Sequence, residues 1–461
     1  MKTRPDWEET PYYDSLFNFK WQQLSKGIMF DLLSSNGTKQ IVNHYENHKC
    51  ITTKNGLFKC LSDYCSEYVF DYVPLTFIIE SNTGEFKKNL ATFQAVFRTF
   101  DENKHKEATL SEHQEMMGRI NDSLPSIPLN NKKSTKNVKF CCNETHFNGY
   151  NLWFLKCTQF NRGKGIYVFN SLDQLVSLID GMDKGLPKTE ASMIISNKDQ
   201  KKKSSTQHPE VCSQKIKSST FVIQKYIEKP LLINDRKFDI RVWVLLTQDL
   251  KVYFFKEGYL RTSSEAFSLS EENIDKEYVH LTNNAVQINS TNYGKFEDGN
   301  QMSFNDFQDY LTEHDPDLVE KTLRNLDIPE GEEVDLKSYI LSEMKKLVVL
   351  TFLSSRENFL NKSKNSSFEI FGFDFIVDCK MKLWLIEVNT NPCLEESSEL
   401  LKSYLPRMID DAFKLTIDVI FKKKINLPDL QRSNEDIHEG ASQEFPVEGH
   451  PDDQNLWELL L

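Results

Sequence analysis

The chain has 461 residues, of which 39% are hydrophobic and 12% aromatic, and this is enough apolar material to exclude a chain that is disordered throughout. Lysine and arginine number 56 against 68 aspartates and glutamates, and the resulting net charge of −12 argues against a nucleic-acid binder. At about 100–200 residues per domain, the length predicts two to four folded units.

Nine cysteines without a C-x-x-C pair indicate neither a disulfide framework nor a zinc finger. The N-terminus is polar and lacks an apolar signal core, and no apolar run approaches the roughly 18 residues that span a membrane. We therefore expect a soluble protein in a reducing compartment, with no membrane or nucleic acid as a partner.

Residues 1–135 are predicted to form an N-terminal α/β domain. The runs KQIVNHY and YVPLTFIIE have the length of strands, and LATFQAVFRTF has helical spacing. The stretch that follows, residues 103–136, is polar and rich in turn residues, so the boundary falls there.

Residues 136–228 are predicted to form a central unit. It contains the strands NLWFLKC, IYVFN and FVIQKYI, and a helix that starts at Ser171, where Gln174 three residues later matches a capping box. Residues 187–218 interrupt this unit with a low-complexity insert that has six lysines between residues 198 and 217. We expect a disordered basic loop there, with contact to a polyanion as the alternative.

Residues 229–425 are predicted to form the last folded unit. KFDIRVWVLLT and KVYFFKEGYLRTS indicate a hairpin, NDFQDYLTEH and SYILSEMKKLVVLTFL indicate helices, and FEIFGFDFIVD and MKLWLIEVN indicate a second hairpin before a final helix at residues 406–421. Because hairpins are frequent among these elements, the fold class is α+β (mixed α/β) and not doubly wound.

Residues 426–461 are predicted to be an acidic disordered tail, since nine acidic residues stand there against one arginine. The closing LWELLL is the one part with the character of an apolar docking segment. Without this tail, residues 1–425 carry a net charge of only −4. We expect that removal of the tail leaves activity intact or raises it.

The second predicted hairpin carries the strongest chemical signal. If its turn is centred between Lys380 and Met381, Asp374 lies directly opposite Glu387, and alternation places Leu383, Leu385, Glu387 and Asn389 on one face. Two like charges in direct register destabilise a sheet unless something neutralises them. Oxygen-bearing side chains at this spacing suit a hard divalent cation with a substrate phosphate. The alternative is a different register in which each acid pairs with its own lysine.

Several cationic groups precede this hairpin in the sequence. Lys156 stands in an apolar strand and requires an anion or a path to solvent. The glycine-containing loop after it, residues 162–165, could cradle phosphates with its backbone, although a plain turn is the simpler interpretation. Lys237, Asp239 and Arg241 share one strand face, which is commonly an exposed charged ladder. Taken singly, Arg261, Thr282 and Asn283 have the pattern of structural loop residues.

Taken in order, these motifs resemble the tubulin–tyrosine-ligase-like family. The resemblance runs through LWFLKCTQFNRGKGI, FVIQKYIEKPLLI, RKFDIRVWVLL, YLRTSSEAFS, YVHLTNNAVQ, NYGKFEDGN and FEIFGFDFIVD…KLWLIEVNTNP, and extends more faintly over QIVNHY, TKNGLFKCL and YVPLTFII. It implies an ATP-grasp fold, in which ATP lies between two antiparallel subdomains.

The resemblance also implies roles for individual residues. Lys156 would contact the phosphates of ATP, and a lid would be formed by Arg162, Gly163, Lys164 and Gly165. A hinge strand whose backbone reads adenine would consist of Gln224, Lys225, Tyr226 and Ile227. Lys237 and Asp239 would lie along the ribose and phosphates. Arg261 would hold the carboxylate of the incoming amino acid, and Thr282 and Asn283 would line the junction between nucleotide and amino acid. Asp374, Glu387 and Asn389 would bind two Mg²⁺ ions.

The implied activity is an ATP-dependent ligase that adds an amino acid, with glutamate favoured, to a carboxylate of the α- or β-tubulin C-terminal tail through an acyl phosphate. Tyrosine or glycine addition by the same mechanism is an alternative, and a non-catalytic tubulin-binding scaffold is another. A protein kinase is less well supported, because the chain has no H-R-D loop. Since an acidic tail replaces the basic microtubule-binding region of larger members, we expect an accessory subunit or soluble tubulin, in the cytoplasm, cytoskeleton or cilium.

Overall fold

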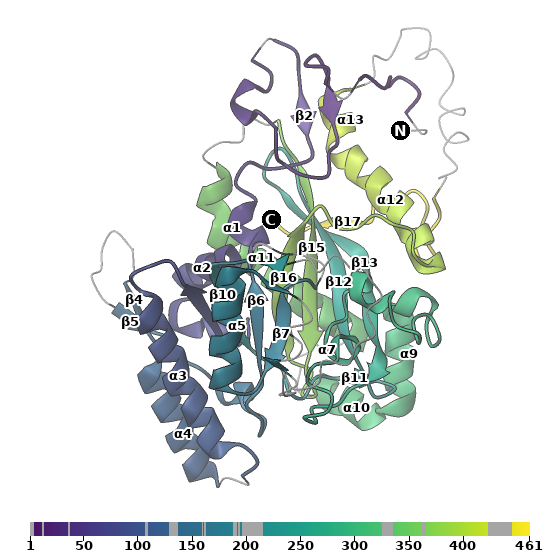
Figure 1. Cartoon of the computed structure of the whole chain (residues 1–461). Helices are drawn as coiled ribbons and strands as arrows, with labels where there is room; N and C mark the ends of the chain where they lie inside the picture. Colours follow the sequence, from purple (N-terminus) through teal and green to yellow (C-terminus); the bar gives the residue numbers. More distant parts are fainter. Residues whose placement is uncertain are drawn as a thin grey trace, which may run out of the picture.

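The structure is a computed structural model that describes residues 4–11, 13–35, 37–106, 109–128, 137–158, 160, 163–187, 191, 194–195, 215–324, 335–360, 366–422 and 445–461. Helices and antiparallel sheets are mixed along the chain, which confirms the predicted α+β class (Figure 1). Within these residues no helix is both long and apolar enough to cross a bilayer.

The first sheet has the strand order β3–β10–β6–β7, and each neighbouring pair is antiparallel. Its strands are β3 (Thr76–Glu80), β10 (Thr220–Lys225), β6 (Trp153–Cys157) and β7 (Ile166–Phe169). The helices α3 (Phe86–Asn103), α4 (Leu110–Ser123) and α5 (Leu172–Lys184) lie beside this sheet in Figure 1. The aromatic rings of Phe93 in α3 and Trp153 in β6 meet edge to face at 4.9 Å, so this helix closes the core of the sheet.

The strand β3 comes from the region expected to be a separate N-terminal domain. It pairs with β10 along its whole length, from Thr76 opposite Gln224 to Glu80 opposite Thr220. A boundary near residue 135 therefore passes through one continuous sheet.

The second sheet has the order β14–β13–β12–β15–β16, with β11 added beside β12 and β17 beside β13. The bounds are β11 (Leu232–Ile233), β12 (Arg236–Leu246), β13 (Val252–Ala266), β14 (Gln301–Ser303), β15 (Glu369–Val377), β16 (Leu383–Thr390) and β17 (Trp457–Leu459). Every residue of β12 is buried, as expected of a central strand. The long helix α11 (Leu336–Leu360) packs on one face, where Phe352 meets Phe371 of β15.

The remaining elements are short or peripheral. They are β1 (Phe19–Lys20), β2 (Ile41–Val42), α1 (Lys49–Thr52), α2 (Lys54–Cys65), β4 (Ser126–Pro128), β5 (Asn137–Lys139), β8 (Leu186–Pro187), β9 (Lys215–Ile216), α7 (Glu277–His280), α8 (Asn284–Gln287), α9 (Phe304–His314), α10 (Pro316–Arg324), α12 (Glu399–Leu415) and α13 (Ile417–Ile420), with 3₁₀ turns η1 (Phe30–Leu32), η2 (Ser66–Asp71), η3 (Glu144–His146) and η4 (Asp298–Asn300).

Two helix starts illustrate how local chemistry sets the boundaries. The Ser171 side chain accepts a hydrogen bond from the Gln174 N–H, as the capping pattern predicts, and the Gln174 side-chain oxygen accepts one from the Asn170 N–H. The final helix α12 begins at Glu399, seven residues before the predicted start, because Ser398 caps it and Pro406 is accommodated inside it.

The prediction of disorder for residues 426–461 is wrong for residues 445–461. The Arg407 guanidinium is fully buried and donates to the carbonyls of Phe445, Pro451, Asp452 and Gln454, which holds the backbone of this segment in place. The segment then pairs with the free edge of β13 as β17, and the Trp457 indole donates to the Met408 carbonyl. Composition alone does not reveal this strand, because the arginine that anchors it lies in α12, outside the segment.

The ends of the predicted basic insert are also ordered. Leu186 pairs with Ile216 between β8 and β9, so disorder is wrong for residue 187 and for residues 215–218. Most of residues 188–214, which include four of the lysines, lie outside the described residues.

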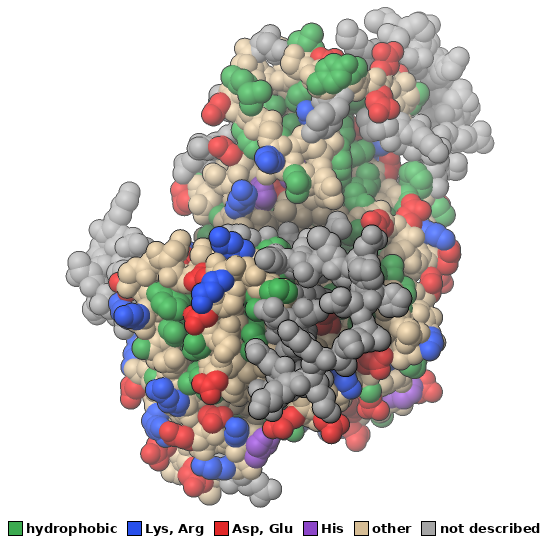
Figure 2. Space-filling model, in the orientation of Figure 1, with side chains coloured by type: hydrophobic (Ala, Val, Ile, Leu, Met, Phe, Trp, Pro, Cys, Tyr) green, Lys and Arg blue, Asp and Glu red, His purple; other side chains and the backbone are tan. Residues whose placement is uncertain are grey.

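The face that Figure 2 shows over α3 and α4 carries both signs of charge side by side. Ion pairs such as Arg119–Glu102 at 2.7 Å account for part of this mixture. The net negative charge is therefore not concentrated on this surface.

Candidate active site between the two sheets

A cleft lies between the two sheets. Its lining combines side chains from β6 and β7 of the first sheet, from β12, β15 and β16 of the second, and from the segment 280–283. These residues are Phe154, Lys156, Ile166, Lys237, Asp239, His280, Leu281, Thr282, Asn283, Asp374, Ile376, Ile386 and Glu387.

The predicted carboxylate pair is present. Asp374 of β15 is the direct cross-strand partner of Glu387 of β16. Near the turn, however, the register differs by one residue, since Val377 pairs with Leu383. A bulge at Ile386 restores the predicted pairing further along.

The same bulge makes one part of the sequence prediction wrong. Leu383 and Leu385 do not share the face of Glu387: both lie in the hydrophobic core, while Ile386 lines the cleft beside Glu387. The extra residue changes the alternation of side chains, and a strict period of two cannot anticipate it.

Asp374 is neutralised by two arginines. Arg241 Nη2 lies 2.9 Å from Asp374 Oδ2, and Arg261 Nη2 lies 2.9 Å from the same oxygen. Burial alone would raise the pKa of Asp374, but the charges of Arg241 and Arg261 outweigh it and hold the pKa well below its usual value. Arg241, which the sequence placed on this face without a role, is thus part of the site.

Arg261 also pairs with Asp239, from Nη2 to Oδ2 at 2.8 Å, so this single guanidinium links two buried carboxylates. The Thr282 hydroxyl donates to Asp239, and Asn283 lines the cleft next to it. The fold therefore brings Arg261, Asp239, Thr282 and Asn283 together at one place.

Asn389 completes the group of oxygen ligands predicted for a metal. Its amide donates to Asp374 Oδ2 at 3.2 Å and to Glu387 Oε1 at 3.1 Å. The Asn389 side chain therefore links the two carboxylates directly. In the described part of the chain no cluster of three or more His, Cys, Asp or Glu has the arrangement of a metal site. Two carboxylates and one amide fit Mg²⁺, which commonly takes one or two carboxylates and completes its shell with substrate phosphates.

Two buried lysines line the same cleft as these acids, Lys156 from β6 of the first sheet and Lys237 from β12 of the second. Lys156 Nζ donates to Gln224 Oε1 at 2.6 Å, and Lys237 Nζ donates to the His280 carbonyl at 3.0 Å and to the Tyr226 hydroxyl at 3.3 Å. Within the described residues neither ammonium is ion-paired with a carboxylate. Burial lowers the pKa of Lys156 to about 8 and that of Lys237 to about 7.

The predicted hinge segment begins inside β10, whose last two residues are Gln224 and Lys225, and continues to Ile227. Its Lys225 and Tyr226 N–H groups already donate to the carbonyls of Leu75 and Leu152, at 2.8 and 3.1 Å. Among the described hydrogen bonds none uses the Ile227 N–H, which leaves that donor for a ligand. The Lys225 side chain is directed away from the cleft into a buried ion pair with Glu228, so it stabilises the strand.

The predicted glycine loop lies against the segment that carries Thr282 and Asn283. Gly163 has φ +77°, and a Cβ on it would come within 2.6 Å of Val286, so only glycine fits there. Gly165 has φ +68° and packs on Cys157, while Lys164 is exposed. Arg162 lies outside the described residues.

Sequence reasoning gave no role to Lys54, at the start of α2. Its Nζ lies 3.9 Å from Glu387 Oε2 and donates to the Phe160 carbonyl at 3.1 Å. With Lys156 and Gln224 it lines a smaller cavity that shares residues with the cleft. A single lysine at the start of a polar helix gives no signal by itself, since only the fold places it beside Glu387.

A sequence model of the tubulin-tyrosine ligase family matches residues 32–426, which include every residue of the cleft. The chain belongs to the tubulin-tyrosine ligase family. This confirms the resemblance drawn from the motifs.

Individual members of the family extend this comparison. Tubulin glycylase 3B of Tetrahymena thermophila is 29% identical over 318 residues, 68% of this chain and 21% of that protein. The probable tubulin polyglutamylase TTLL9 of Bos taurus is 31% identical over 251 residues, 54% of this chain and 50% of that protein. Tubulin glycylase 3A of Drosophila melanogaster is 31% identical over 277 residues, 59% of this chain and 22% of that protein. The chain thus matches between about a fifth and a half of these relatives.

Proposed function

We propose that this protein is an ATP-dependent ligase that joins an amino acid to a carboxylate of the tubulin C-terminal tail. The observation that carries the proposal is a cleft that holds buried lysines and acids together. Lys156 and Lys237 make no ion pair with a carboxylate among the described residues, and Asp374 and Glu387 line the same cleft. A buried cation without an anion is costly, so such a pair of lysines favours an anionic ligand.

In this proposal Lys156 and Lys237 bind the phosphates of ATP, and the Ile227 N–H and neighbouring carbonyls contact adenine. Asp374, Glu387 and Asn389 would hold Mg²⁺, which supplies positive charge to the phosphates during transfer. The number of Mg²⁺ ions is proposed to be two. Arg261 holds the carboxylate of the incoming amino acid only by sharing the charge that it now gives to Asp239 and Asp374.

The reaction proceeds in two steps. Transfer of the γ-phosphoryl group of ATP to the acceptor carboxylate gives an acyl phosphate, and the amino group of the incoming amino acid then attacks the acyl carbon and releases phosphate. The side chains of the cleft position the reactants and exclude the water that would hydrolyse the acyl phosphate.

The donor amino acid is proposed to be glutamate or glycine. Relatives named as glycylases and as a polyglutamylase match at 29–31% identity, so the comparisons support both donors. Tyrosine, the alternative drawn from HLTNN and NYGKFEDGN, rests on the motifs alone. A tubulin tail as acceptor implies association with the cytoskeleton, and an accessory subunit or ciliary location would extend the same proposal.

The test is incorporation of labelled glutamate, glycine and tyrosine, each alone, into tubulin, with the modified tail identified by mass spectrometry. We expect one of the first two to be incorporated by the wild type, and Glu387→Gln to reduce the rate by roughly 100-fold or more, the effect of losing a charge stabiliser at a transition state. Equal incorporation by both proteins, including none, would remove the catalytic proposal.

The non-catalytic scaffold predicts a different binding result. A ligase with this site gains thermal stability from ATP only when Mg²⁺ is present. A scaffold without nucleotide binding would show no such shift.

A further inference from the structure

Glu369, the first residue of β15, is a buried acid to which the proposed reaction gives no role. Its oxygens accept hydrogen bonds from the Thr390 hydroxyl at 2.6 Å and from the Tyr45 N–H at 2.8 Å. The His44 ring adds a third contact, from Nδ1 to Glu369 Oε1 at 3.2 Å. One buried carboxylate therefore joins three segments that lie far apart in the sequence.

Thr390 connects this carboxylate with the predicted metal ligands. It is the last residue of β16 and follows Asn389 directly. Its hydroxyl is bonded to Glu369 in β15, the strand that also carries Asp374. Because Asn389 and Thr390 share a peptide bond, the bond to Glu369 restricts the positions that the Asn389 side chain can take.

The orientation of the Asn389 amide decides whether it can serve a cation. Its Nδ2 donates to Asp374 Oδ2 and to Glu387 Oε1, at 3.2 and 3.1 Å. An ionised carboxylate only accepts hydrogen bonds, so the amide nitrogen must face the two acids. Among the hydrogen bonds of the described residues none uses Asn389 Oδ1. This oxygen is therefore available to a hard cation, which prefers oxygen ligands.

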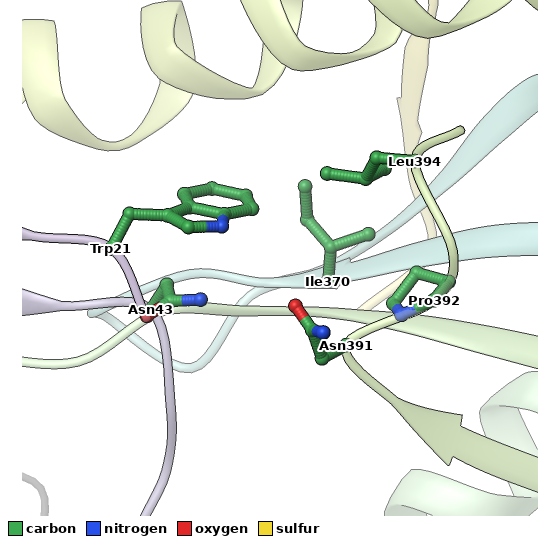
Figure 3. Close-up of a pocket in the computed structure, with 6 residues that line it drawn as sticks. All are labelled: Trp21, Asn43, Ile370, Asn391, Pro392 and Leu394. Carbon is green, nitrogen blue, oxygen red and sulfur yellow. The ribbon is translucent and has the colours of Figure 1, made fainter. Parts of the chain in front are cut away.

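The turn after β16 is also held against β15. Figure 3 shows Asn391 and Pro392 where the chain leaves the strand. Asn391 has φ +47°, a left-handed conformation that asparagine adopts more readily than most residues. Gly372 is the cross-strand partner of Asn389, and a Cβ placed on it would lie only 3.1 Å from Pro392. The backbone after Asn389 is thus fixed by packing as well as by the bond to Glu369.

The N-terminal partners of Glu369 are themselves fixed to the second sheet. The Tyr45 hydroxyl donates to the Thr247 carbonyl, directly after β12, at 2.6 Å. Further along the same segment, Lys54 Nζ lies 3.9 Å from Glu387 Oε2. Residues 44–54 therefore contact the β15–β16 hairpin at two places, one at Glu369 and one at Glu387.

We propose that Glu369 is a positioning residue for the metal: through Thr390 it fixes the end of β16 and so holds Asn389 as a ligand of Mg²⁺. Glu369 itself touches neither the metal nor the substrates. Groups that hold a metal ligand in place in this way commonly lower metal affinity when they are removed. The inference rests on the proposed function, because it takes Mg²⁺ to bind with ATP in the cleft.

The experiment uses the full chain and the variant Thr390→Val, which removes the hydroxyl and keeps a β-branched side chain of the same shape. Mn²⁺ is the probe for the metal, and its binding in the presence of a non-hydrolysable ATP analogue is followed by electron paramagnetic resonance. Thr390→Val should raise the Mn²⁺ concentration at half-saturation about three- to tenfold, the effect of one lost hydrogen bond to a charged group. At saturating Mn²⁺ its affinity for the analogue should equal that of the wild type.

Two controls distinguish positioning from a general loss of stability. Thr390→Ser keeps the hydroxyl and should bind Mn²⁺ as the wild type does. Thr351→Val removes the hydroxyl of another buried threonine, which donates to the Leu347 carbonyl in α11, and should also leave Mn²⁺ binding unchanged.

A double-mutant cycle tests whether Thr390 acts through Asn389. Asn389→Ala removes the amide and should itself weaken Mn²⁺ binding. Addition of Thr390→Val to Asn389→Ala should then have no further effect, because the ligand that Thr390 holds is absent. Fold-changes that multiply in the double variant would overturn the assignment.

The metal-binding measurement separates this inference from the ligase proposal. If the wild type transfers no amino acid, yet binds Mn²⁺ with the analogue and loses affinity only in Thr390→Val, the role of Glu369 is supported and the ligase is not. Equal Mn²⁺ binding by the wild type and Thr390→Val, an equal loss in Thr351→Val, or no Mn²⁺ binding by the wild type would overturn the positioning role whatever the activity.

Discussion

Asp374 and Glu387 stand opposite each other across the β15–β16 hairpin, yet the fold neutralises only the first of them fully. Asp374 is paired with Arg241 and Arg261, whereas the nearest cation to Glu387 among the described residues is Lys54 at 3.9 Å. The two acids therefore have different roles. Asp374 is part of a buried network of ion pairs, whereas the carboxylate of Glu387 can bind a cationic ligand.

This difference predicts opposite results from two similar substitutions. Asp374→Asn removes the negative charge that neutralises the buried guanidiniums of Arg241 and Arg261, and it should lower the free energy of unfolding by about 3–5 kcal/mol. Glu387→Gln, at a partly exposed side chain, should change it by less than about 1 kcal/mol and should still abolish Mg²⁺-dependent stabilisation by ATP. Urea unfolding with and without Mg²⁺ and ATP measures both effects. Equal destabilisation by the two substitutions would contradict the assignment of roles.

The buried lysines allow a second comparison. Lys156→Met and Lys237→Met each remove a buried cation that has no carboxylate partner among the described residues. The unliganded protein should therefore unfold at the same or a higher temperature, while its stabilisation by ATP is lost. Lys225→Met instead leaves the buried Glu228 carboxylate without its cation and should lower the free energy of unfolding by about 3–5 kcal/mol. Thermal unfolding of the three variants decides the matter, and a large loss of intrinsic stability in the first two would count against a phosphate-binding role.

Nucleotide binding should depend on pH through the same lysines. Phosphates favour the charged amine, so binding raises the pKa of Lys156 from about 8 and that of Lys237 from about 7, and protons are taken up. Affinity for ATP is then greatest below this window and falls as pH rises through it, by roughly tenfold or more between pH 7 and 9. Calorimetry in buffers of different ionisation enthalpy measures the uptake, and heats that do not depend on the buffer would contradict it.

The C-terminal strand gives a prediction about stability alone. Trp457 is buried against Phe255 and Met408, so Trp457→Ala should lower the free energy of unfolding by about 3–5 kcal/mol. Leu461→Ala, at a half-exposed side chain, is the matched control and should cost less than about 1 kcal/mol. Removal of residues 426–461 is accordingly expected to destabilise the protein, in contrast to the expectation from composition. An unchanged urea midpoint for Trp457→Ala would instead support the prediction that residues 426–461 are disordered.

Local patterns were sufficient for the parts of the fold that depend on neighbours in sequence. Strand alternation identified the β15–β16 hairpin and the pair Asp374 and Glu387, and helical spacing identified α3, α9 and α11. These features follow from side-chain periodicity and turn chemistry, which a sequence displays directly.

Features that depend on distant contacts were not predictable in this way. The bulge at Ile386 arises from fitting one hairpin into a sheet, Lys54 reaches Glu387 only through the packing of α2, and β17 is held by Arg407 and the edge of β13. No local pattern encodes such contacts, because each partner is unremarkable in its own segment.

The position of β3 has a practical consequence for anyone who dissects this protein. A fragment that begins at residue 136, where the sequence first indicates a boundary, would lack the strand that covers β10. The exposed edge would present the backbone groups of residues 220–224 to other chains, a known route to aggregation through strand pairing. The smallest soluble fragment that retains the sheet of Lys156 must therefore include residues 76–80.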